Sequence, residues 1–89
     1  MLQKTLTIIN RLGLHARAAA KFVGLASGYR CDVQIEKAGR RVNGKSIMGV
    51  MMLAASRGSE VTLYLDGEDE EQALQALQTL IENRFDEGE

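Results

Sequence analysis

The sequence predicts an α+β fold in which helices cover one face of an antiparallel sheet. Segments with apolar residues at every second position alternate with segments whose apolar residues recur every three to four positions, in the order βαββαβα. Every predicted strand has one polar face, which disfavours a parallel sheet buried on both sides. The length of 89 residues suits a single two-layer core. We therefore expect one domain over residues 1–89, with its helices packed on the same face of the sheet.

The first strand leads directly to a helix. Leu2, Leu6 and Ile8 are apolar at even positions and predict a strand that is buried on one face. From Ala16 the apolar spacing becomes helical, and Ser27-Gly28 supplies a glycine stop.

A hairpin is predicted next. Cys31, Val33 and Ile35 alternate with polar residues, and Gly39 lies in a short turn before a strand over residues 40–43. This arrangement is typical of two neighbouring antiparallel strands.

A short second helix follows, and it has more apolar surface than one buried stripe requires. Ser46 is a good N-cap residue, and helical spacing extends from Ile47 to Ala55. We expect burial on the side with Val50, Leu53 and Ala54, and exposure on the side with Ile47, Met48, Met51 and Met52.

The last strand and helix complete the pattern. Val61, Leu63 and Leu65 alternate with polar residues and predict a strand with one solvated face. Asp69 is suited to cap the third helix. The expected buried stripe of this helix consists of Ala73, Leu74, Leu77, Leu80 and Ile81. We expect the tail, residues 84–89, to be frayed.

Composition and charge exclude several classes of function. The net charge is −1 and the basic residues are dispersed, which argues against a nucleic-acid-binding stripe or a membrane patch. Cys31 is the only cysteine, so an intramolecular disulfide is impossible and a metal-ligand cluster is not indicated. No apolar run is typical of a signal peptide or a membrane span. We expect a cytoplasmic monomer without metal or cofactor that acts on a protein partner.

His15, the one histidine of the chain, precedes the predicted first helix. The backbone N–H groups of a first helical turn lack intrahelical partners and stabilise an anion. Here these groups belong to Ala16, Arg17 and Ala18, and the Arg17 guanidinium can reach the same place. Because a neutral imidazole is a nucleophile, we hypothesise that His15 carries a phosphoryl group. The pattern alone leaves open that His15 is an ordinary surface or helix-cap residue.

Two segments of the chain resemble one known family. Gly13-Leu14-His15-Ala16-Arg17, followed by Ala19-Ala20-Lys21-Phe22-Val23, looks like the active-site segment of the histidine-containing phosphocarrier (HPr) family. Asn43-Gly44-Lys45-Ser46-Ile47-Met48-Gly49-Val50-Met51-Met52-Leu53 resembles the regulatory-serine helix of that family. The order of elements is similar from Leu2 to about Asn83, so the resemblance spans nearly the whole chain.

The resemblance implies both a topology and a function. It implies an open-faced sandwich whose four-stranded sheet has the order 1-4-2-3, with three helices on one face. It also implies that His15 accepts phosphate through Nδ1 from an enzyme I-type protein of a phosphoenolpyruvate-dependent phosphotransferase system, and passes it to an enzyme IIA-type protein. Such a protein is a phosphoryl carrier with no small-molecule catalysis of its own.

One position bears on the branch of the family. Ala18 stands where many sugar-branch members have proline, and the alanine version is similar to the nitrogen-related branch. The resemblance therefore favours the nitrogen-related branch, with the sugar-transport branch as the alternative.

The second segment implies regulation and docking. The regulatory serine falls on Ser46, which implies a site for a serine kinase or phosphorylase besides the N-cap role, and the docking patch falls on Ile47, Met48 and Met51. A regulatory binding module that acts through this helix, without phosphate on His15, is a rival function of another class. A ferredoxin-like small-molecule sensor is a third interpretation of the α+β pattern.

Basic residues are expected to surround His15 and to steer acidic partner surfaces. The candidates are Arg11, Arg17, Lys21 and Lys45. The alternative is that these are ordinary solvated side chains.

Overall fold

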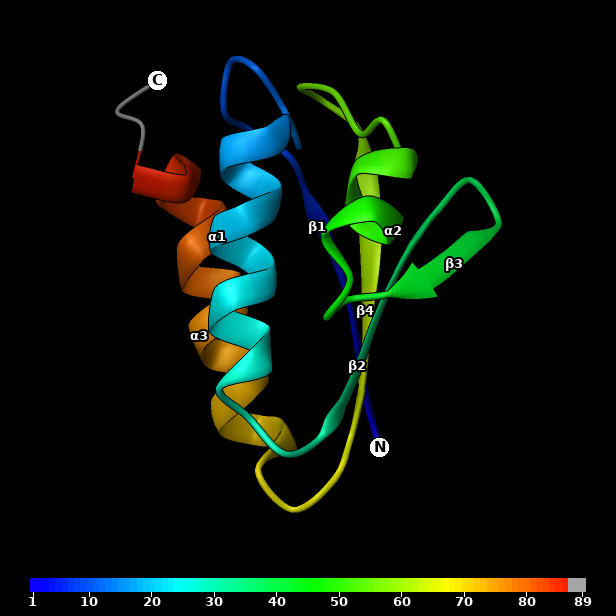
Figure 1. The fold of residues 1–89 in the computed structure, drawn as a ribbon, viewed down its shortest axis with the longest axis vertical. Helices are drawn as coiled ribbons and strands as arrows, with labels where there is room; N and C mark the ends of the chain where they lie inside the picture. The colour runs from blue at the N-terminus through cyan, green and yellow to red at the C-terminus, as the bar shows by residue number, and fades with distance from the viewer. Residues whose placement is uncertain (87–89) are drawn as a thin grey trace.

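The computed structural model describes residues 1–86 and has the predicted order of elements (Figure 1). The elements are β1 Leu2–Thr7, α1 Ala16–Ser27, β2 Asp32–Lys37, β3 Arg40–Asn43, α2 Ile47–Met52, β4 Glu60–Asp66, α3 Glu70–Glu82 and the short 3-10 helix η1 Arg84–Asp86. Within residues 1–86, none of the helices is long and apolar enough to cross a bilayer.

The sheet has the strand order β1-β4-β2-β3, and every pairing is antiparallel. The register places Leu6 opposite Val61, and Ile35 opposite both Leu63 and Val42. Because side chains alternate between the faces of a sheet, this register gathers the apolar residues of the four strands on one side. The predicted α+β class and the 1-4-2-3 order are both confirmed.

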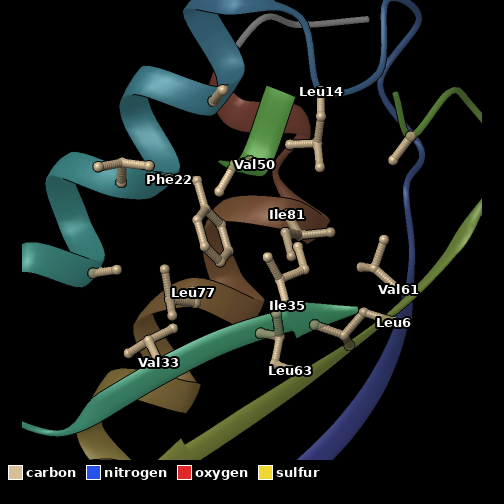
Figure 2. Packing of buried hydrophobic residues seen from close by; sticks show 14 of the residues in the cluster. Leu6, Leu14, Phe22, Val33, Ile35, Val50, Val61, Leu63, Leu77 and Ile81 are labelled. Carbon is tan, nitrogen blue, oxygen red and sulfur yellow. The ribbon is translucent and has the colours of Figure 1, made fainter. Parts of the chain in front are cut away.

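The core lies between this apolar face and the helices. Figure 2 shows the Phe22 ring of α1 pointing toward Leu77 of α3, above Val33 and Ile35 of β2. All four side chains are fully buried. Burial of each such side chain stabilises the fold by about 1.5–3 kcal/mol relative to exposure.

The opposite face of the sheet is polar. Thr5 and Thr62 share a hydrogen bond of 3.0 Å between their hydroxyls across β1 and β4. The Arg41 guanidinium lies 3.8 Å from the centre of the Tyr64 ring. Cross-strand contacts of this kind stabilise a sheet face that no helix covers.

The second helix is shorter than predicted. It ends at Met52 instead of Ala55, and Ala54 adopts a left-handed conformation with φ of +50°. Lys37 Nζ donates to the carbonyl oxygens of Leu53 and Ala54, and Arg40 donates to that of Met52. These cations from the β2–β3 hairpin satisfy the last carbonyls, so another helical turn is not required. Ala54 is consequently exposed and not buried as expected.

Asp69 precedes α3 as predicted, but its side chain makes no capping bond. Its carboxylate instead accepts hydrogen bonds from the backbone N–H groups of Arg30 and Cys31, at 2.8 and 2.9 Å. The bond from Arg30, followed by that from Cys31, lowers the pKa of the Asp69 carboxyl. Asp69 thus fixes the start of α3 to the connection between α1 and β2.

The predicted frayed tail does not begin at residue 84. Residues 84–86 form η1, and the Phe85 side chain is fully buried in the core. A buried aromatic ring over the end of α3 holds this segment in place, which the polar composition of the tail did not indicate. Residues 87–89 lie outside the described residues.

Candidate functional site

His15 is the N-cap residue of α1, and the helix begins at Ala16 as predicted. Its backbone is extended, with φ of −74° and ψ of 179°, and its carbonyl oxygen accepts the first intrahelical hydrogen bond from Ala19 N–H at 2.8 Å. The N–H groups of Ala16, Arg17 and Ala18 precede this first bond. They therefore form the anion-stabilising end of a twelve-residue helix, next to the imidazole.

The turn before His15 is held by backbone contacts. Gly13 has φ of +67°, and a Cβ atom at this position would lie 2.4 Å from the carbonyl oxygen of Ala55. Leu14 N–H donates to that same oxygen at 2.8 Å. A side chain at position 13 would break this contact, so glycine is required there.

Asn10 also holds the turn, a role that was not predicted from the sequence. Its side chain is fully buried, and Nδ2 donates to the Gly13 carbonyl oxygen at 2.8 Å, while Gly13 N–H donates to the Asn10 carbonyl oxygen at 3.2 Å. The signal available in the sequence was an asparagine three residues before a glycine, a common turn pattern.

His15 is half-buried and opens into a hollow of about 640 Å³. The other residues lining the hollow are Arg11, Leu12, Ala16, Arg17, Lys21 and Asp86. The structure therefore brings three of the expected cations to one place beside the imidazole. Positive charge around a helix N-terminus favours a dianionic group such as phosphate.

Lys45 does not belong to this site, contrary to expectation. Its Nζ donates to the carbonyl oxygen of Tyr29 at 2.7 Å, beyond the C-terminal end of α1. The twelve residues of α1 separate that place from His15 by about 18 Å at 1.5 Å per residue. The fold thus directs the Lys45 side chain to the opposite end of α1 from His15.

The predicted docking residues lie on the exposed side of α2. The exposed fractions are 45% for Ile47, 71% for Met48 and 39% for Met51, and Met52 is 57% exposed. Val50 is fully buried on the opposite side. We call the four exposed residues the α2 patch. Four exposed apolar side chains on one short helix are typical of a protein-binding surface.

Ser46 is the N-cap residue of α2, as predicted. Its Oγ accepts a hydrogen bond from Gly49 N–H at 3.1 Å, and its carbonyl oxygen accepts the first intrahelical bond from Val50. The side chain therefore satisfies one of the unpaired donors of the helix start.

Replacing Ser46 by alanine is expected to lower the free energy of unfolding by about 1 kcal/mol, because the Gly49 N–H loses its acceptor. Urea unfolding monitored by circular dichroism measures this loss. Ser46→Asn retains a capping oxygen and is the matched control, which is expected to unfold near the wild-type midpoint. Equal midpoints for all three proteins would contradict the capping role.

Chemically, the arrangement is able to hold and exchange an anion. The imidazole lines an open hollow, and the cations and helix amides around it favour a negatively charged group at this place. The hollow is wide and the imidazole half-exposed, so a group on a second protein can approach it.

Comparison with known proteins agrees with this description. Residues 2–83 match the family described as "PTS HPr component phosphorylation site". The chain is 60% identical over 89 residues to a phosphocarrier protein HPr of Cupriavidus necator, with all of both chains covered, and 60% identical over 85 residues to one of Pseudomonas aeruginosa, with 94% of each covered. The structure resembles the crystal structure of HPr-C-His from Thermoanaerobacter tengcongensis, with a TM-score of 0.95, 48% identity and 98% of each chain covered.

The order of strands, the cationic hollow at the start of α1 and these matches over nearly the whole chain point to one conclusion. The chain belongs to the HPr family, the phosphocarrier component of the phosphotransferase system.

Proposed function

We propose that His15 is the phosphoryl acceptor of this phosphocarrier, with Arg17 and the backbone N–H groups of Ala16, Arg17 and Ala18 stabilising the phosphoryl oxygens. The observation that carries the proposal is the position of His15: it is the N-cap residue of α1 and lines a hollow with Arg11, Arg17 and Lys21. Helix amides and cations together supply the charge that a phosphoryl dianion requires.

The proposed transfer is an exchange between two imidazoles. The lone pair of His15 Nδ1 forms a bond to phosphorus, while the N–P bond of a phosphohistidine on an enzyme I-type donor breaks and its electron pair returns to the donor ring. Each ring keeps a proton on the nitrogen that does not bind phosphorus, so a ring is cationic while it carries the phosphoryl group and neutral after it has released it. The step therefore takes up and releases no proton, and no water takes part. In the second step His15 is the donor: a nitrogen of the enzyme IIA-type acceptor forms the new bond to phosphorus, and the N–P bond to His15 Nδ1 breaks. Since similar bonds form and break, each step is reversible.

Ala18, where the chain resembles the nitrogen-related branch, is the residue on which the branch proposal rests. Its side chain is fully buried, and its N–H belongs to the first turn of α1, where proline would remove a donor. The finer proposal is therefore a regulatory phosphocarrier, acting as a cytoplasmic monomer, with the sugar-transport branch as the alternative.

The test is phosphorylation by purified donors of both branches. The chain is incubated with phosphoenolpyruvate and an enzyme I-type protein of either branch, and the modified residue is mapped by mass spectrometry under alkaline conditions. We expect an acid-labile, base-stable adduct on His15, formed faster with the nitrogen-related donor. An adduct on another residue would contradict the proposal, and faster loading by the sugar-branch donor would reverse the branch assignment.

Met48→Asp tests the α2 patch as the docking surface for the donor. Met48 is 71% exposed, so the substitution is expected to leave folding intact while placing a charge in an apolar contact. We expect the KM of the donor for this carrier to rise about tenfold, which corresponds to about 1.4 kcal/mol of binding energy, with little change in kcat.

The matched control is Gln72→Asp, which adds the same charge at an exposed position of α3. Steady-state phosphorylation of both variants is measured over a range of carrier concentrations. An equal change in KM for the two variants would show a general charge effect and would contradict docking through the α2 patch.

Ser46 is proposed as a modification site for a serine kinase or phosphorylase. The hydroxyl caps α2 immediately before the α2 patch, so a phosphoryl group on Oγ would bring a charge of about −1.5 to −2 to the edge of that surface. Repulsion of an acidic partner is the expected consequence.

A further inference from the structure

The lining of the hollow at His15 includes one acidic residue. Among the described residues that line it, Arg11, Arg17 and Lys21 are basic and Asp86 alone is acidic. A carboxylate repels a phosphoryl dianion and opposes the cations that would hold it. A hollow that only had to bind phosphate tightly would therefore not be expected to include the Asp86 carboxylate.

Several contacts hold Asp86 at the hollow. Phe85, the preceding residue, is fully buried, and its carbonyl oxygen accepts a hydrogen bond from Lys21 Nζ at 2.8 Å. Asn83 Nδ2 donates to Asp86 Oδ1 at 2.5 Å, and Asp86 N–H donates to the Asn83 carbonyl oxygen at 3.0 Å. Figure 1 shows the result, with η1 in red beside the N-terminal part of α1.

The backbone conformation of η1 shows that tertiary contacts determine its position. Arg84, Phe85 and Asp86 have φ values of 54°, 53° and 62°, a left-handed conformation that residues other than glycine rarely adopt. Successive residues of this kind are retained only where the surroundings require them. Here the burial of Phe85 and the Lys21 contact supply that requirement, and both direct Asp86 to the site.

We propose that Asp86 is an electrostatic residue of the transfer site, which weakens the hold of the hollow on the phosphoryl group of His15 and so favours its release to the acceptor. The inference rests on the proposed phosphorylation of His15. In this role Asp86 forms no covalent bond and transfers no proton. The exchange of the phosphoryl group between the two imidazoles is unchanged. Its negative charge raises the energy of the loaded carrier relative to the empty one, because it acts on the dianion and not on the neutral ring.

The test is the loading equilibrium between the carrier and a phosphorylated enzyme I-type donor. Equal amounts of carrier and donor are mixed, and the phosphorylated fraction of each is read from native gels. We expect Asp86→Asn to raise the equilibrium constant for loading about two- to fivefold, as removal of one nearby charge in a solvated site predicts. Asp86→Lys is expected to raise it further.

Glu71→Gln is the control. It removes the same charge from an exposed residue at the start of α3, while η1 follows the other end of that thirteen-residue helix. We expect its loading equilibrium to equal that of the wild-type chain. Thermal unfolding of each variant checks that η1 and the fold are retained.

The outcomes separate this inference from the proposed function. A wild-type chain that acquires no phosphoryl group overturns the proposed function and the inference with it. Normal loading of the wild-type chain, with Asp86→Asn indistinguishable from Glu71→Gln, overturns the inference alone. An equal effect of Asp86→Asn and Asp86→Lys would reveal a structural role of the residue and would also overturn the electrostatic one.

Discussion

His15→Ala is expected to abolish phosphorylation by the enzyme I-type donor while leaving the fold intact. The variant lacks the only imidazole of the chain, and no other residue at the start of α1 supplies a neutral nitrogen nucleophile. The side chain is half-buried and makes no capping hydrogen bond, so the free energy of unfolding is expected to change by less than about 1 kcal/mol. Intact-mass measurement at alkaline pH, with circular dichroism of the same sample, checks both statements.

Ser46→Ala is the matched control for this experiment. Ser46 is the other proposed phosphorylation site, and a phosphoserine is stable to acid whereas a phosphohistidine is not. The control is expected to accept the acid-labile phosphoryl group at the wild-type rate. An acid-labile adduct that persists in His15→Ala would place the phosphoryl group on another residue and would refute His15 as the acceptor.

The fold was predictable where one periodicity extends over a whole element. Val33, Ile35, Leu63 and Leu65 alternate with polar residues and are all fully buried, because the side chains of a strand alternate between its two faces. Prediction failed where a tertiary contact overrides the local pattern. Ala54 has the spacing and the propensity for helix, yet its backbone is left-handed, and cations from the β2–β3 hairpin bind the carbonyl oxygens of Met52, Leu53 and Ala54 itself.

The part of the site that could be predicted consists of residues close together in the sequence. The helix start fixes His15, Arg17 and the first amides within a few residues of one another, so rules for helix termini sufficed. Asp86 reaches the same hollow from the other end of the chain, through the burial of one aromatic ring. The prediction for Lys45 was wrong for a related reason. Its Nζ binds the Tyr29 carbonyl oxygen, an acceptor sixteen residues earlier in the chain.

Phe85→Ala is expected to have the largest effect on stability. The Phe85 ring is fully buried, and truncation of such a ring costs about 3–5 kcal/mol through lost burial and the cavity that is left. Since small domains have a total stability of about 5–15 kcal/mol, the variant is expected to be partly unfolded at modest urea concentrations. Urea unfolding monitored by circular dichroism, at constant temperature, measures the shift of the midpoint.

Arg84→Ala is the matched control, which separates loss of the buried ring from a change of residue in the same segment. Arg84 is exposed and has the same left-handed backbone as Phe85, so its substitution changes the chain at the same place without opening the core. A change below about 0.5 kcal/mol is expected for it. If the segment were frayed from residue 84, Phe85→Ala would be equally harmless. Only an anchored η1 makes the two variants differ, and only an anchored η1 keeps Asp86 beside His15.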